Sequence, residues 1–350
     1  MDPLILLAIY ASLGYFGGMA ALSYAGVRLL REGKAKESIA CFRAGALLNL
    51  SPQGRLIMQS NLIAALTVLG DLDGANREWA GMVVSLPQGG RELAFATACY
   101  AACLVRQGRY EEGLQVLSLG GSLERGSILE DARWEDSSRV SVGARGLLGE
   151  GQAMRLLQSA TCLLELGRFE EARESLELAM ELRPQSQILR QNLELYRARL
   201  AWCTGQMSEA YALAHSVRVD SSPAVYLEIM LLQKALILAI SGYPDEAEDL
   251  LDRRVSVASS RGFYLRPLLE GVVAELRGSY GDAQRLYRAA MRSGQPAGEA
   301  AWRGGFLAER HGRFSEALSY FEEAVNVDSE SWWARSSAAA LVRLREKLQG

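Results

Sequence analysis

Eight glycines divide most of this 350-residue chain into intervals of similar length, and this periodicity constrains its fold more than any other feature. All but one of the intervals are 34 to 38 residues, and the remaining one is 59. Five residues after each glycine stands a small residue. A glycine that ends one helix, followed by the packing face of a second, predicts a helical hairpin copied eight times. The glycines are Gly33, Gly70, Gly108, Gly167, Gly205, Gly242, Gly278 and Gly312.

The clearest copy of this hairpin is the stretch from Leu163 to Pro184. Two apolar helical patterns meet at Gly167, which fits the left-handed residue at a helix end. Ala172 and Leu176 then recur on one face of the second helix. We expect the small side chain of Ala172 to let the two helices approach closely, so that Leu176 fills the space one turn later.

This pattern resembles the tetratricopeptide repeat, which has small residues before and after the turn glycine and an aromatic residue one turn later. The best copies are Ala153–Ser186 and Gly298–Glu330, and the resemblance covers about residues 19 to 330. It implies an all-α fold, a right-handed α-solenoid of about eight hairpins. The expected parts are an N-terminal apolar helix (1–27), repeats 1–3 (19–117), a Gly-rich insertion (118–151), repeats 4–8 (152–330) and a C-terminal capping helix (331–350).

The N-terminal segment is the least typical of a helical repeat. Residues 4–27 carry no charged side chain and would form a helix of about 36 Å, against a bilayer core of about 30 Å. The basic residues Arg28, Arg31, Lys34 and Lys36 follow it, and basic flanks stay on the cytoplasmic side. We therefore expect a single-pass membrane anchor with cytoplasmic repeats. A soluble N-terminal cap and a cleaved signal peptide are the alternatives.

The 118–151 insertion interrupts the period with many glycines, mixed charge and the single aromatic Trp134. One interpretation is a solvated connection between two halves of the array. The other is a flap or partner-binding element with Trp134 as its apolar contact.

The sequence offers no catalytic, metal or cofactor site. It lacks the usual phosphate-loop, serine-hydrolase and zinc-protease motifs, and its two histidines have no metal-spaced partner. Cys99 and Cys103 are one helical turn apart without further ligands nearby in sequence, so we expect buried thiols. A net charge of −3 without a basic run argues against nucleic acid, and no small-molecule substrate is evident.

The resemblance implies that partners bind on the concave surface, which the first helix of each repeat lines. The inner positions are mostly apolar and do not match the two-carboxylate clamp of chaperone-binding members. We therefore expect a protein partner that lays an apolar helix or extended segment into the groove. The candidate partner-binding residues are Arg199, Trp202, Trp302 and Phe306, together with Trp134 in the insertion.

Two functions follow from these expectations. The first is a non-catalytic, membrane-tethered scaffold or assembly factor, similar to bacterial membrane-anchored repeat proteins. The alternative is a soluble cytoplasmic adaptor or regulatory subunit without an anchor. An enzyme is not expected.

Overall fold

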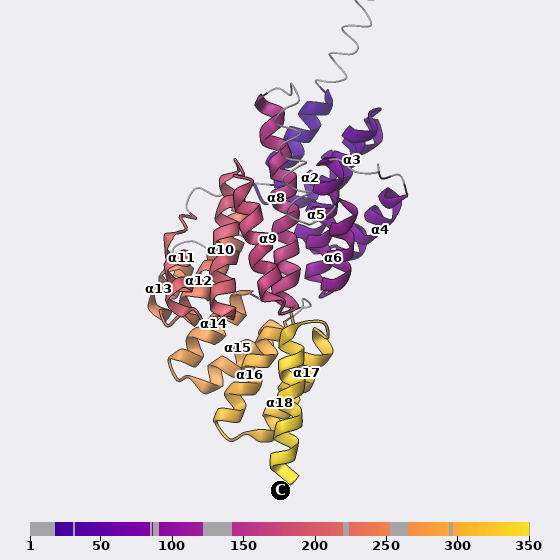
Figure 1. Cartoon of the computed structure of the whole chain (residues 1–350). Helices are drawn as coiled ribbons and strands as arrows, with labels where there is room; N and C mark the ends of the chain where they lie inside the picture. Colours follow the sequence, from indigo (N-terminus) through magenta and orange to yellow (C-terminus); the bar gives the residue numbers. More distant parts are fainter. Residues whose placement is uncertain are drawn as a thin grey trace, which may run out of the picture.

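The computed structural model describes residues 18–30, 32–84, 86, 91–121, 142–219, 224–252, 265–293 and 297–349, and all regular structure in these ranges is helical (Figure 1). Residues 18–30 form the first described helix. The labelled helices follow: α2 (Ala35–Leu48), α3 (Pro52–Leu69), α4 (Leu72–Val83), α5 (Arg91–Arg106), α6 (Tyr110–Leu119), α8 (Val142–Glu165), α9 (Phe169–Glu181), α10 (Gln187–Cys203), α11 (Met207–Ser216), α12 (Ala224–Ile240), α13 (Pro244–Asp252), α14 (Leu265–Leu276), α15 (Tyr280–Met291), α16 (Gly298–Arg310), α17 (Phe314–Val327) and α18 (Trp332–Gln349).

Each predicted turn glycine has a positive φ, the left-handed conformation, and follows the first helix of its hairpin. The predicted hairpin turns are therefore confirmed. Gly167 illustrates the reason. Its φ is +67°, and the N–H of Arg168 returns to the carbonyl of Leu163 at 2.8 Å, which satisfies an end carbonyl of α8. A side chain at this position would be strained, because L-residues seldom adopt a positive φ.

A pair of residues at fixed positions faces across each hairpin, and in six of the eight hairpins one is small and the other bulky; the contact is direct at Gly26, Gly271 and Gly305, where an added Cβ would touch the ring of Phe42, Tyr287 or Phe321. The first-helix residue lies seven positions before the turn glycine, and the second-helix residue lies sixteen positions after the first. Where the second residue is an aromatic ring, the first is glycine in three of four hairpins; where it is leucine, the first is alanine. The pairs are Gly26–Phe42, Ile63–Trp79, Ala101–Leu117, Ala160–Leu176, Ala198–Ala214, Ala235–Leu251, Gly271–Tyr287 and Gly305–Phe321.

The apolar core follows the array as successive clusters, each shared by neighbouring hairpins. One cluster spans the first three repeats, a second lies between α8, α9 and α10, and a third extends from α10 to α17. The small residues after the turn glycines are buried throughout, as predicted. This distribution is typical of a solenoid, in which each unit is stabilised mainly by its neighbours.

The last ten residues of the predicted insertion 118–151 are helical, because residues 142–151 belong to helix α8. Four glycines in this stretch favoured a loop, since each costs about 1 kcal/mol in a helix relative to alanine. A tertiary contact stabilises the extension: the carboxylate of Glu150 accepts a hydrogen bond from the backbone N–H of Ser186 at 2.7 Å. Glu150, near the end of this stretch, thus holds α8 against the turn that leads into α10.

The predicted membrane segment 4–27 lies mostly outside the described residues, of which only 18–27 overlap it. Among the residues that the structure describes, no helix combines the length and apolar character needed to cross a bilayer.

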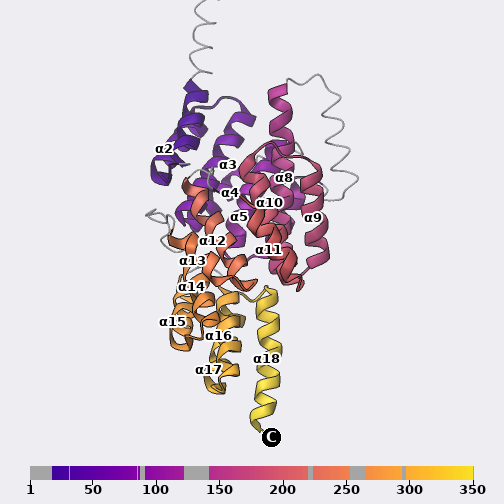
Figure 2. The same cartoon turned by 90° about the vertical axis from the view of Figure 1, so that its left-hand side faces the viewer.

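The array curves until its C-terminal end returns to its middle. Figures 1 and 2 both place the first turn of α18 beside the α8–α9 turn, although nearly 170 residues of chain separate the two. Farther along α18, Leu341 and Leu344 pack on α17 and α16 as part of the terminal apolar cluster.

Candidate functional site

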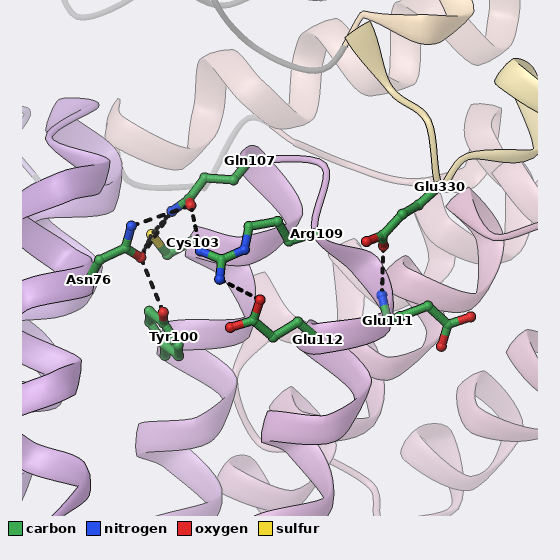
Figure 3. Close-up of polar contacts among 8 residues, drawn as sticks. All are labelled: Asn76, Tyr100, Cys103, Gln107, Arg109, Glu111, Glu112 and Glu330. Atoms are coloured by element: carbon green, nitrogen blue, oxygen red, sulfur yellow. Dashed lines mark hydrogen bonds and ion pairs between the residues drawn. The ribbon is translucent and has the colours of Figure 1, made fainter. Parts of the chain in front are cut away.

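The contact between the C-terminal end of the array and its middle is made by residues 328–336, here called the C-terminal corner. Its carboxylates reach the start of α6: the Tyr110 hydroxyl donates to Asp328 Oδ2 at 3.2 Å, and the Glu111 N–H donates to Glu330 at 2.9 Å. Figure 3 shows the second bond. Arg109, the residue before α6, supplies no side-chain cap of its own. Glu330 therefore caps a helix that lies 219 residues away.

The corner also covers the α8–α9 turn. Arg335 donates a short hydrogen bond to the carbonyl of Leu166, and a second bond of 2.8 Å to the carbonyl of Glu330. A Cβ placed on Gly167 would lie 2.7 Å from Cβ of Trp332, so only glycine lets the corner approach this closely. The Trp332 ring packs edge-on against Phe169, with centroids 5.9 Å apart.

The helices α10, α12, α14 and α16 share one surface, here called the inner face. Four tryptophans meet where the corner reaches α10 and α16 of this face. Trp333 lies 5.6 Å from Trp202 of α10 and 5.0 Å from Trp302 of α16, measured between ring centroids. Trp332 is 5.9 Å from Trp302, whose indole N–H donates to Ser336 Oγ at 2.9 Å. Trp333 is only 1% exposed. Rings at these separations bury large apolar areas and favour one another through edge and offset contacts.

Beside these rings lies a buried network of charged side chains. Arg199 pairs with Glu165 at 2.6 Å and approaches Glu299 at 3.7 Å, while Arg303 pairs with Glu299 at 2.9 Å. The Trp333 indole donates to the remaining Glu165 oxygen at 3.2 Å. Two arginines thus face two glutamates, so the charges balance, and the corner completes the hydrogen bonding of Glu165.

Two carboxyl groups at this junction have raised pKa values. Burial raises the pKa of Glu165, and neighbouring Arg199 opposes that rise. Burial, with the nearby negative charge of Glu165, raises the pKa of Asp328 to about 7, although the hydrogen bond from Tyr110 acts in the opposite direction. The junction therefore favours the protonated form of Asp328.

The structure brings four of the five predicted partner-binding residues to this junction. Arg199 and Trp202 lie on α10, Trp302 and Phe306 lie on α16, and the rings of Trp302 and Phe306 are 4.9 Å apart. The same side chains contact residues of this chain, so their use by a partner remains a prediction. Trp134 lies outside the described residues.

Sequence reasoning missed the corner itself, including Trp332, Trp333 and the buried residues Glu165 and Arg303. One signal was available. Adjacent residues on a helix are about 100° apart, so two neighbouring tryptophans make a wide aromatic surface on the first turn of this helix. The pair therefore indicates a second contact surface at the start of α18, in addition to the face that carries Leu341 and Leu344.

Beyond Arg199 the inner face continues as a narrow cleft between α10, α12, α14 and α16. Its lining is mostly apolar, and its free volume is about 20 Å³, room for about one water molecule. Tyr196, Trp202 and Ile240 are only half-buried there. The lining residues are Leu195, Tyr196, Arg199, Trp202, Gln233, Leu236, Ile237, Ile240, Leu265 and Glu299.

A wider groove of about 1070 Å³ lies between α6, α8 and α9. Four glutamates and one arginine line it, so its walls are negatively charged. Arg168 pairs there with Glu171 at 2.5 Å and lies 3.9 Å from Glu111. Polar walls of this kind do not fit the apolar segment expected from the sequence.

The thiols of Cys99 and Cys103 lie in the core of the early repeats. Burial raises the pKa of Cys99 to about 12, so this thiol is protonated at neutral pH. Cys103 accepts a hydrogen bond from Gln107, which also contacts Asn76 (Figure 3). Within the described ranges, no three His, Cys, Asp or Glu side chains group closely enough to hold a metal ion.

Comparison with protein families matches residues 156–186 to the tetratricopeptide repeat, which covers the second half of α8 and all of α9. No curated protein matches the sequence. Solved structures with some similarity include the crystal structure of yeast Tom70, 14% identical over 95% of this chain and 88% of that chain, with a TM-score of 0.34. The P58(IPK) TPR domain is 13% identical over 95% and 99% of the two chains, with a TM-score of 0.27. Neither similarity is close enough to transfer a partner or a role.

Proposed function

We propose that this chain is a non-catalytic adaptor that binds a protein partner on the inner face of its second half. The observation that carries the proposal is the apolar cleft between α10, α12, α14 and α16, with Trp202 and Arg199 at one end. Aromatic side chains and arginine dominate the energetics of protein interfaces. An apolar helix or extended segment is the ligand that suits this lining.

The half-buried residues of the cleft give the proposal a direct test. A photo-cross-linking phenylalanine analogue at Tyr196, which faces the cleft, should capture the partner when the full chain is irradiated in cell extract. The same analogue at Arg345, an exposed residue of α18, is the matched control. Mass spectrometry should then map the cross-link to an apolar segment of the captured protein. Equal capture at both positions would contradict binding in the cleft.

The predicted aromatic residues provide a second test of the same surface. Replacing Trp302 and Phe306 together by alanine should weaken partner recovery at least tenfold, which requires about 1.4 kcal/mol. Because Trp302 also contacts the C-terminal corner, thermal stability must be measured on the same variant. Unchanged melting with unchanged recovery would exclude these rings as binding residues.

Membrane attachment of the adaptor is a separate proposal, supported by the uncharged run 4–27 and the basic residues after it. An adaptor without an anchor is the alternative. Full-length protein that is recovered without detergent after cell breakage would contradict the anchor. Deleting residues 2–27 should otherwise move the protein from the membrane fraction to the supernatant.

A further inference from the structure

The C-terminal corner differs from the rest of the array in the range of its contacts. Most packing elsewhere joins neighbouring hairpins, and the Arg199–Glu299 pair spans 100 positions, whereas four hydrogen bonds of the corner join residues 168 to 219 positions apart. The helix α18 is also held independently, because Leu341 and Leu344 pack on the preceding hairpin. The corner can therefore separate from α6, the α8–α9 turn and α10 while every hairpin stays folded.

The closed inner face leaves little room for a second chain. Its cleft accommodates about one water molecule, whereas a helix with its side chains has a diameter of about 10–12 Å. The corner borders this cleft, because Trp333 packs on Trp202, one of the lining residues, and hydrogen-bonds Glu165. The side of Trp202 and the Glu165 oxygen that Trp333 contacts become accessible to a partner segment only if the corner moves away.

The corner also contains a polar atom that closure does not satisfy. Asp328 is buried, and its Oδ1 has no hydrogen-bond partner among the described residues. Tyr110 of α6, Glu165 of α8, Glu330 and Ser331 are the polar groups around it. A buried carboxyl oxygen without a partner destabilises the closed arrangement relative to one in which water reaches it. This contact is therefore a weak point of the closed array.

We infer that the C-terminal corner is an internal occupant of the inner face, and that the protein partner displaces it with a segment of the same chemistry. That segment presents a carboxylate, two adjacent aromatic residues and an arginine, as in the corner sequence Asp-Ser-Glu-Ser-Trp-Trp-Ala-Arg. The inference rests on the proposed function, because it specifies the partner and the regulation of the same surface.

A labelled synthetic peptide of residues 326–338 is the probe, and the full chain is the receptor. Trp333→Ala removes the ring that covers Trp202, so the peptide should bind this variant at least tenfold more tightly than wild type. A peptide with both tryptophans replaced by alanine should not bind. Val342→Ala, an exposed change on the same helix, is the control and should behave as wild type. Equal affinity for wild type and Trp333→Ala would overturn the inference.

Opening itself is measured without any ligand. In Trp333→Ala, X-ray scattering should give a larger radius of gyration, and the amides of residues 166–168 should exchange faster. The pair Tyr110→Phe and Glu330→Ala removes both side-chain hydrogen bonds to the start of α6 and leaves the tryptophan rings in place, so it should act in the same direction if Trp333→Ala misfolds. If the double variant of Tyr110 and Glu330 has the same radius of gyration and amide exchange as wild type, the inference that the corner can be displaced is wrong. Capture of a partner at Tyr196 would still stand in that case, so the two proposals fail separately.

Discussion

Replacing Gly305 by alanine should destabilise the last hairpin, and replacing Phe321 by leucine in the same chain should restore much of the loss. A Cβ at Gly305 would lie 2.4 Å from Cε1 of Phe321, whereas carbon atoms in contact are normally about 3.5–4.0 Å apart. The ring must therefore retreat by about 1 Å. It is fully buried, and Phe306 packs edge-on against it with centroids 5.1 Å apart.

Overpacking of this kind costs about 1–3 kcal/mol, and the confined ring places Gly305→Ala near the upper value. Alanine gains about 1 kcal/mol over glycine in a helix, so the net loss should be about 2 kcal/mol. Leucine opposite alanine is the combination that three other hairpins use. We therefore expect the two substitutions to couple favourably by about 2 kcal/mol, within the range for residues in contact.

Urea denaturation followed by tryptophan fluorescence measures this coupling, because Trp302 lies on the same helix. With a slope of about 2 kcal/mol per molar urea, Gly305→Ala should lower the midpoint by about 1 M. Gly81→Ala is the control, since a Cβ there meets no atom within 4 Å, and its midpoint should stay or rise. A Gly305→Ala midpoint equal to wild type, or additive losses in the double variant, would refute the proposed packing.

Three further outcomes are expected. Ala172→Leu should lower the urea midpoint more than Glu170→Ala. Overpacking the fully buried Ala172 site costs about 1–3 kcal/mol of stability, whereas loss of the exposed helix-start charge of Glu170 costs about 0.3–1 kcal/mol, so equal midpoints would contradict this packing. Glu330→Ala should cost about 1 kcal/mol and speed amide exchange at the start of α6; unchanged exchange would exclude the cap. Burial raises the pKa of Asp328 to about 7, so between about pH 4 and 7 the folded state binds more protons than the unfolded state. The free energy of unfolding should therefore fall as pH rises from about 4 to 7 and then level, and Asp328→Asn should reduce that slope.

The hairpins were predictable from sequence because their determinants are local. A turn glycine needs only its own backbone conformation, and the size of one residue is matched by another sixteen positions later. Gly167 with Ala172 and Leu176 is an example: the glycine has a positive φ, and both apolar side chains are buried. Such features repeat in every hairpin, so one well-formed copy reveals the others.

The closure of the array was not predictable by the same reasoning. Hairpin register predicts which face of its helix a residue occupies, as for Arg199 and Trp302. It does not show which turns meet after many hairpins, because the course of the array is the sum of small rotations between neighbours. The contact of Glu330 with α6 therefore has no local signal in the sequence, because it depends on the accumulated curvature of about two hundred residues.

The long-range bond from Glu330 to α6 has a consequence for the order of folding. Hairpins form from contacts close in sequence, and local contacts form fastest, so each unit can fold soon after it is synthesised. The start of α6 is made early, but its cap lies 219 residues later, near the end of the chain. Throughout that interval the start of α6 has no side-chain cap, and the final residues complete a structure whose other hairpins are already formed. Loss of the last two dozen residues would thus leave the array permanently unclosed, and would also expose the apolar face of α16 and α17 on which α18 packs.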